Sequence, residues 1–434
     1  MLPAAFDRIA PGKAETNYHE PPLLRRSLNP NRIQTTSAKP GAVHMSVDPR
    51  TLTSTFEQFF NSEKSSGILL IGCTILSLLL ANSPLATEYA GVWRMVVGGL
   101  SLEHWINDAL MAIFFLLIGL ELERELYSGE LADVRNAMLP MFAAIGGVAA
   151  PALIHFSLNA GTPTQAGIGI PMATDIAFAL GVLALLGSRV PASLRVFVVA
   201  FAIIDDLIAI VVIAVFYSTQ LSIGYLVAAL TVWGLLCALN RYFRVMSLTP
   251  YLLGGALMWF LMLKSGVHAT IAGVMLAFAI PFSAKADDEA SPSHRLEHFL
   301  HKPVAFVILP IFALANTAIP ISANWMQNLT EANSLGIVAG LIFGKPLGVT
   351  LLCFVAVASG LCRLPADLGW RHVFGAGLLG GIGFTMSIFI TNLAFSGDAE
   401  NVNASKMAIL LASLIAGAIG FLWLRFQGKR VEDA

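Results

Sequence analysis

The sequence is short of charge. Only 12% of its 434 residues are charged, against about a quarter in soluble domains, whereas 56% are hydrophobic. The 26 basic and 27 acidic residues nearly cancel, and no basic stripe with interleaved aromatics is present, so no nucleic-acid partner is expected. Together with a mean hydropathy of +0.74, this composition predicts an all-α polytopic membrane protein whose main partner is the lipid bilayer.

Cysteine is also scarce, and the N-terminus lacks the apolar run of a signal peptide. The four cysteines lie far apart with no CxxC spacing, so neither a disulfide framework nor a zinc site is expected, and no cofactor is implied. Residues 1–50 are polar and rich in Pro, Asn, Ser and Thr, which predicts a disordered cytoplasmic extension within which Met45 is a candidate start. We expect a membrane domain at 51–426 and a cytoplasmic tail at 427–434.

Long apolar segments are abundant. Helical spacing of apolar residues over 51–60 predicts a short interfacial helix. Twelve candidate spans follow, at about 65–83, 105–120, 137–157, 165–186, 193–217, 222–240, 250–263, 267–282, 303–320, 335–358, 373–395 and 404–424. The positive-inside rule then places both termini in the cytoplasm, with Arg94, Lys264 and Lys406 assigned to loops on the other side. This assignment leaves Lys345 as the one basic residue inside a span.

Two adjacent carboxylates interrupt the most apolar span. Asp205 and Asp206 lie near the middle of FVVAFAIIDDLIAIVVIAVF (197–216), and Asp175 is also deep. A charged side chain at the centre of a membrane helix is unfavourable by roughly 2.5–3.5 kcal/mol, so these carboxylates require a partner, a cavity or a cation. Because neighbouring helical residues point about 100° apart, Asp205 and Asp206 must face different surroundings. They are the candidate working site, with Lys345 as a candidate partner.

Two spans carry signals of a broken helix. Pro171, in AGIGIPMATDIAFALG, removes a backbone donor and predicts a break near Thr174 and Asp175. Glycines in GLLGGIGFTMSIF loosen the eleventh span in the same way. These two spans are the middle members of two triplets, which predicts inverted-topology repeats with two discontinuous helices crossing at the midplane. Asp175 would then neutralise N-terminal helix ends, and Lys345 would face C-terminal ends.

Several runs resemble the NhaA-type sodium/proton antiporter family along most of residues 51–426. They are WINDALMAIFFLLIGLELERE (105–125), ATDIAFALGVLALLGSRVP (173–191), AIIDDL (202–207), LKSGVHAT (263–270), RLEH (295–298), GKPLG (344–348) and GIGFTMSIFI (381–390). That family is itself a known example of inverted repeats with broken helices. The resemblance implies that Asp206 is the principal cation and proton carboxylate, that Asp205 is its essential neighbour paired with Lys345, and that Asp175 and Thr174 sit at the helix crossing.

The resemblance also implies regulation and assembly. It assigns pH response to Glu121, Glu125, Glu297 and His268 and a homodimer to a β-hairpin at 95–102. Sodium would bind at Asp205 and Asp206. The expected function is electrogenic, pH-regulated exchange of Na⁺ or Li⁺ for H⁺ in the bacterial inner membrane, by alternating access and without enzyme activity.

Other interpretations of the same residues remain open. Deep aspartates on two helices also suit an intramembrane aspartyl protease, although no GxGD-like run is present and a protease has no use for Lys345. A cation channel would need a ring or filter instead of broken helices. A transporter of another ion or an organic anion is a third alternative, disfavoured by the net negative charge of the deep residues. Lys345 suits a structural counter-ion as well as a proton carrier, and His268 suits packing as well as sensing.

Overall fold

The computed structural model of this chain describes residues 49–218, 221–283, 291–321 and 324–427. Contacts between residues group Arg50–Ala434 into one unit, and the fold given below is that of this unit. The extension expected at 1–50 and the tail expected at 427–434 lie almost entirely outside the described residues, so both stay predictions.

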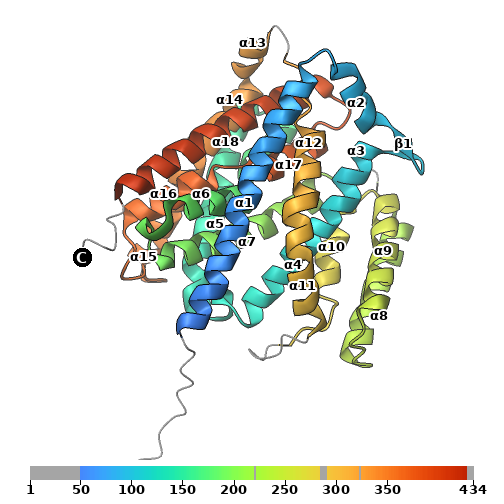
Figure 1. Cartoon of the computed structure of the whole chain (residues 1–434), viewed down its shortest axis with the longest axis horizontal. Helices are drawn as coiled ribbons and strands as arrows, with labels where there is room; N and C mark the ends of the chain where they lie inside the picture. The colour runs from blue at the N-terminus through green and yellow to red at the C-terminus, as the bar shows by residue number, and fades with distance from the viewer. Residues whose placement is uncertain (1–48, 219–220, 284–290, 322–323, 428–434) are drawn as a thin grey trace, which may run out of the picture. The chain divides into compact units, whose positions relative to one another are not determined.

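Helices make up most of the described chain, as Figure 1 shows. The elements of the first half are α1 (Pro49–Ala81), α2 (Ala86–Arg94), β1 (Val96–Val97), β2 (Leu100–Ser101), α3 (Leu102–His104), η1 (Trp105–Leu110), α4 (Met111–Tyr127), η2 (Glu130–Ala132), α5 (Val134–Asn159), η3 (Pro163–Met172), α6 (Ile176–Leu186), η4 (Gly187–Arg189) and α7 (Ala192–Phe216). Those of the second half are α8 (Ile223–Arg241), α9 (Leu248–Ser265), α10 (Ile271–Ala277), α11 (Pro292–Pro303), η5 (Val304–Ile308), α12 (Leu309–Asn316), α13 (Trp325–Leu329), α14 (Ala332–Ala339), η6 (Gly340–Gly344), α15 (Lys345–Ala358), α16 (Trp370–Gly380), α17 (Phe384–Ala394) and α18 (Ala399–Gln427). Segments labelled η are 3₁₀ or π-helical.

Eight described helices are long and apolar enough to cross a membrane, or up to ten if two bent helix pairs each count as one span. Ten of the twelve expected spans correspond to these segments. The seventh is α9, and the eighth contains only the seven-residue α10. At 1.5 Å per residue α10 is roughly 10 Å long, about a third of a hydrocarbon core. Length and composition therefore support a polytopic membrane protein and leave the count of twelve as a prediction.

The N-terminal helix corrects one expectation. Residues 51–60 are helical as expected, but they do not form a short helix of their own, because α1 runs without interruption from Pro49 to Ala81. Residues 61–64, between the two expected elements, include neither proline nor glycine, the two residues that most disfavour a helix interior. Near its end α1 is tied to the second half of the chain, since Ser77 Oγ donates a 2.8 Å hydrogen bond to the Leu314 carbonyl of α12.

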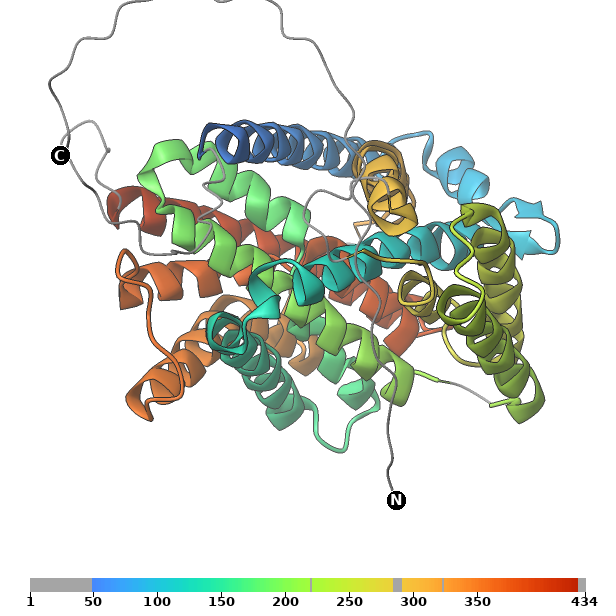
Figure 2. The same cartoon turned by 90° about the horizontal axis from the view of Figure 1, so that it is seen from below.

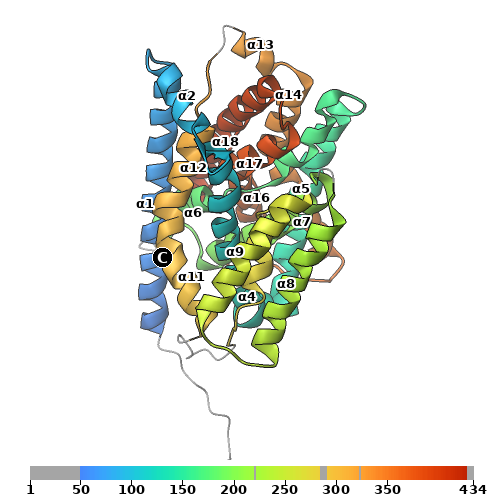
Figure 3. The same ribbon diagram turned by 90° about the vertical axis from the view of Figure 1, so that its right-hand side faces the viewer.

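Distant segments of the chain meet in the bundle interior. α5 contacts both α7 and α15, and α16 contacts α7, α15 and α18. Glycines permit the closest approach: a Cβ atom on Gly146 of α5 would lie 2.1 Å from the Gly348 carbonyl oxygen of α15. At the edges, α8 lies beside α9 and α1 lies beside α11 and α12, as Figures 2 and 3 show. The interior thus joins the two triplets of spans that the sequence singled out.

The expected hairpin at 95–102 is present. β1 and β2 pair antiparallel with Val96 opposite Ser101 and Val97 opposite Leu100. Gly98 and Gly99 between them have φ values of 62° and 88°, which the tight two-residue turn requires and which only glycine adopts without strain. Val96 is 71% exposed, so the hairpin presents an apolar surface.

Candidate functional site

The first broken span passes through the interior as two half-helices. η3 ends at Met172, Ala173–Asp175 are not helical, and α6 begins at Ile176, so the break lies where Pro171 predicted it. Asp175 is the N-cap of α6, because its Oδ1 accepts a 3.2 Å hydrogen bond from the Phe178 N–H. A short polar side chain at this position satisfies a backbone donor that the break leaves without a partner.

The second broken span has its break at Gly381–Gly383. α16 ends at Gly380, α17 begins at Phe384, and the two half-helices are bent by 48°. Glycine is needed here for space, since a Cβ atom on Gly381 would lie 2.3 Å from the Leu341 carbonyl oxygen. The backbone can therefore pass close to its neighbours at the break.

The two breaks cross and are hydrogen-bonded to each other. The Asp175 N–H donates to the Ile382 carbonyl at 2.6 Å, and the Thr174 hydroxyl donates to the Gly380 carbonyl at 2.9 Å. The Asp175 carboxylate in turn accepts from both the N–H, at 3.0 Å, and the hydroxyl of Thr385. Asp175 therefore binds the N-terminal ends of α6 and α17 together, where helix dipoles favour negative charge.

Lys345 lies at the opposite kind of helix end. It is fully buried at the start of α15, and its Nζ lies 2.9 and 2.8 Å from the two carboxylate oxygens of Asp205. The same ammonium donates to the carbonyl of Met172, the last residue of η3. A cation at the C-terminal end of a half-helix complements its dipole. At the helix crossing, the negative Asp175 thus lies at N-terminal helix ends and the positive Lys345 lies at a C-terminal helix end.

Asp206 differs from its neighbour. It is fully buried, and neither of its carboxylate oxygens has a hydrogen-bond partner among the described residues. Since burial of a charge without a partner is strongly unfavourable, this carboxylate must carry a proton or hold a cation. Within the described residues no group of three or more His, Cys, Asp and Glu side chains could hold a metal ion, so a hard cation here would rely on Asp206 and nearby backbone or hydroxyl oxygens.

The crossing also involves groups that the sequence did not single out. Thr385 is the clearest, and its signal was available: a hydroxyl residue stands two positions after the glycine break in GIGFT. The Met172, Gly380 and Ile382 carbonyls take part through the backbone, for which side-chain identity gives no signal.

Three of the four residues assigned to pH response lie on α4 and α11. Arg124 joins two of them, with Nη1 3.0 Å from Glu125 Oε1 and Nε 2.8 Å from Glu297 Oε1. Glu121 lies one helical turn before Glu125 on α4. His268 is elsewhere: its Nε2 lies 3.1 Å from the Tyr217 carbonyl oxygen, and it lines a cavity that also contains Asp108. The structure therefore separates His268 from the glutamates.

Lys406 corrects the expected charge distribution. Its assignment to a loop is wrong, because it lies within α18 and is only 5% exposed. Lys406 falls at the very start of the predicted span 404–424, but α18 begins five residues before that span, at Ala399, so the lysine lies within the helix and not at its end. Lys345 is consequently not the only buried lysine.

The membrane-length helices define the chain as a polytopic membrane protein. Its interior site, with two broken helices that cross and buried charges at the helix ends, is of the kind found in secondary transporters. Residues 57–424 match the model of the family described as Na⁺/H⁺ antiporter 1, and the chain belongs to that family.

Curated relatives cover the same region. A Na⁺/H⁺ antiporter NhaA of Dechloromonas aromatica is 73% identical over 375 residues, spanning 86% of this chain and 96% of the relative. A Na⁺/H⁺ antiporter NhaA 1 of Flavobacterium johnsoniae is 56% identical over 86% of this chain and 97% of its own length. A Na⁺/H⁺ antiporter NhaA of Mesorhizobium japonicum is 50% identical over 85% and 93%, respectively.

Proposed function

We propose that this chain is a secondary transporter that exports Na⁺ or Li⁺ in electrogenic exchange for H⁺, by alternating access of the crossing site to the two faces of the membrane. The names of its relatives support the exchange of Na⁺ for H⁺. The observation that carries the proposal is Asp206, a buried carboxylate with no hydrogen-bond partner among the residues described, next to Asp205, which is paired with Lys345.

Competition at Asp206 produces the coupling. A buried carboxylate is neutralised either by a proton or by a cation, and the two exclude each other at one site. If the site faces one side of the membrane at a time, Na⁺ leaves on the side where a proton replaces it. No hydrolysed fuel is required, because either gradient drives the other.

Asp205 and Lys345 set the charge balance around Asp206. Their ion pair and the bond to Met172 keep the ammonium at the end of η3. Asp175 and Thr174 hold the two broken helices at a fixed distance, so that the site is preorganised. Two protons per Na⁺ require either both aspartates or one aspartate and Lys345 to take up protons, and transport then moves net charge and responds to membrane potential.

Regulation by pH is assigned to the Arg124 cluster, defined here as Glu121, Arg124, Glu125 and Glu297. Its Arg124–Glu297 ion pair links α4 to α11, and its Arg124–Glu125 ion pair lies within α4. Protonation of a glutamate weakens such a link, which gives the helices a way to respond to acid. His268 lies outside the cluster, where its Nε2 contacts the Tyr217 carbonyl oxygen, so we assign it to packing and not to the pH response.

The wider arrangement belongs to the same proposal. The chain would span a bacterial inner membrane twelve times, with inverted repeats and both termini in the cytoplasm. The Arg124 cluster would face the cytoplasm. The exposed hairpin of β1 and β2 would join two copies into a homodimer. No cofactor or nucleic acid takes part.

The geometry disfavours the rival functions. In an aspartyl protease two aspartates share a proton, whereas here Asp175 binds Thr385 and Asp205 binds Lys345. A channel needs a continuous filter, and the crossing instead blocks the interior with paired backbone groups.

Everted membrane vesicles test the proposal. After acidification of the lumen, addition of NaCl or LiCl should raise the luminal pH when the wild-type chain is present. Asp206→Asn should abolish this response, because an amide neither binds a proton nor balances Na⁺. Asp367→Asn, at an exposed position, is the matched control and should keep it. A full response in Asp206→Asn would reject the assigned role of Asp206, and none in the wild type would reject the function.

A further inference from the structure

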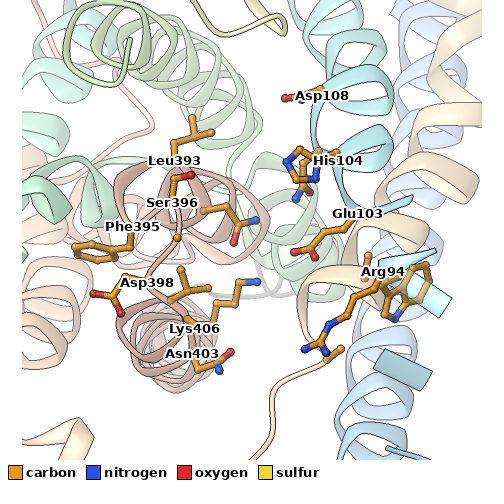
Figure 4. A pocket seen from close by; sticks show the side chains of 18 of the residues that line it. Arg94, Glu103, His104, Asp108, Leu393, Phe395, Ser396, Asp398, Asn403 and Lys406 are labelled. Atoms are coloured by element: carbon orange, nitrogen blue, oxygen red, sulfur yellow. The ribbon is translucent and has the colours of Figure 1, made fainter. Parts of the chain in front are cut away.

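Lys406 faces a cavity that the crossing site does not use. The cavity has a volume of about 680 Å³, and Figure 4 shows the Lys406 side chain pointing across it toward Glu103 of α3. Glu103 attracts the ammonium group electrostatically, but no hydrogen bond or ion pair within the described residues holds it. A lysine buried to this extent usually has a direct partner. Packing alone therefore does not account for its position.

The cavity lies at the end of the bundle opposite the Arg124 cluster. Asp108, in its wall, and Glu125, in that cluster, are near the two ends of the 26-residue segment Leu102–Tyr127, which is about 39 Å long if straight. On the inner side of the cavity, α17 contributes Asn392, which lies about two helical turns beyond Thr385. The cavity is thus separated from the crossing by a short part of one half-helix.

Carboxylates outnumber the lysine and arginine side chains in the wall of the cavity. Glu103, Asp108 and Asp398 line it, against Arg94 and Lys406, and His104 and His268 are also in the wall. Asn401 donates a side-chain hydrogen bond of 2.7 Å and a backbone one of 3.1 Å to Asp398, and these bonds hold the pKa of that carboxyl below its usual value. Asp398 is accordingly ionised at neutral pH, and the cavity attracts cations.

We propose that Lys406 is a positioning charge that weakens Na⁺ binding from the cavity side: its ammonium repels cations that the carboxylates collect, and so lowers the apparent affinity for Na⁺ on that face of the membrane alone. This inference rests on the proposed exchange of Na⁺ for H⁺. For an exporter the effect is useful, because a released Na⁺ is less readily taken back from the side with the higher concentration.

The size of the effect follows from the setting. A unit charge at several ångströms in a hydrated cavity, with an effective dielectric constant between those of protein and water, changes the local concentration of a monovalent cation by roughly three- to tenfold. Salt reduces the effect, because the Debye length is about 10 Å at 0.1 M. The segment that separates the two faces is about 39 Å long, nearly four times this Debye length, so the influence of Lys406 on the opposite face is negligible.

The test measures the Na⁺ concentration for half-maximal exchange in right-side-out and in everted vesicles, at an ionic strength held at about 0.1 M. Lys406→Gln should lower this concentration three- to tenfold on the cavity side and leave it unchanged on the other side. The unchanged value on the other side shows that the variant is folded and active. Lys406→Arg keeps the charge and should stay within twofold of the wild type. Lys264→Gln, which changes an exposed lysine at the end of α9 that does not line the cavity, should do the same.

Four results would overturn the inference. The first two are a Na⁺ concentration for half-maximal exchange that Lys406→Gln leaves unchanged on both sides, and one that it changes equally on both sides. The third is a change that Lys406→Arg reproduces. The fourth is a change seen in chloride but absent in gluconate, which would show that Lys406 instead holds an anion. If the wild type shows no Na⁺-dependent exchange from either side, the proposed function itself fails and the inference falls with it.

Discussion

The two buried lysines occupy opposite kinds of surroundings. Lys345 is held by both oxygens of Asp205 and by a helix-end carbonyl, whereas Lys406 faces a cavity and a carboxylate that it does not contact. The difference shows that burial alone does not define the role of an intramembrane charge. Lys345, which has fixed partners, joins helices. Lys406, which faces a cavity, acts electrostatically on ions that enter the cavity.

The largest expected difference concerns stability. Lys345→Met leaves Asp205 buried without its counter-ion, and breaking a buried pair in this way costs about 3–5 kcal/mol. Lys406→Met removes an ammonium that no described residue holds by a hydrogen bond or ion pair, so no buried counter-ion is left behind and the cost should be less than about 1 kcal/mol. Thermal unfolding of the purified protein in detergent measures both variants.

Equal destabilisation by the two substitutions would remove the distinction between the lysines. The double variant Lys345→Met, Asp205→Asn sharpens the test, because it removes both charges and should recover much of the lost stability. Exchange activity measured in parallel separates the two roles of Lys345. A well-folded Lys345→Met variant with no exchange favours a proton-carrying lysine, and one with residual exchange favours a structural counter-ion.

An intermediate effect is expected at the crossing itself. Thr385→Val removes the hydroxyl that donates to Asp175 and keeps the backbone bond, so one buried acceptor loses one of its donors, at a cost of about 1–3 kcal/mol. Thr231→Val is the matched control, because that hydroxyl bonds only the Val227 carbonyl of its own helix at an exposed position. Thermal unfolding should show a lower midpoint for Thr385→Val alone, and equal midpoints would mean that the Asp175 contact contributes nothing.

The smallest expected effect is on regulation. Glu297→Gln removes a partly exposed ion pair with Arg124, which contributes at most about 1 kcal/mol. Because 1.36 kcal/mol corresponds to one pH unit, the pH profile of exchange should shift by less than about one unit while the preference between Na⁺ and Li⁺ is kept. His268→Gln should leave the profile within experimental error, and a larger shift for His268→Gln than for Glu297→Gln would reverse the assignment.

Much of the crossing was predictable from residue types. Pro171 and the glycines at 380–383 restrict or free the backbone locally, so the breaks could be located without knowledge of the fold. The opposite placement of Asp175 and Lys345 also followed, since helix ends have fixed polarity. The bond from Thr385 to Asp175 was not predictable in the same way, because it joins residues that are far apart in the chain and depends on how two broken helices cross.

Lys406 marks the limit of reasoning from charge. The positive-inside rule describes where basic residues prefer to lie, and it placed this lysine in a loop. The extra turn at the start of α18 and the cavity opposite it, formed by α2, α3 and α17, overrule that preference. The span 267–282 shows a similar limit, since its apolar composition does not reveal that only seven residues of it form a helix.

By itself, the sequence determined that this chain is a membrane protein with two broken helices and a small set of deep charges, because hydrophobicity, proline and glycine act locally on the backbone. Only the tertiary structure decided which charges have partners. Asp205 and Asp206 are adjacent and chemically identical, yet one is paired with Lys345 and the other has no hydrogen-bond partner in the part of the chain that the structure describes. That difference arises because the packed bundle brings Lys345, at the start of α15, to Asp205 of α7 and to the Met172 carbonyl of η3, and packing is a property of the assembled bundle.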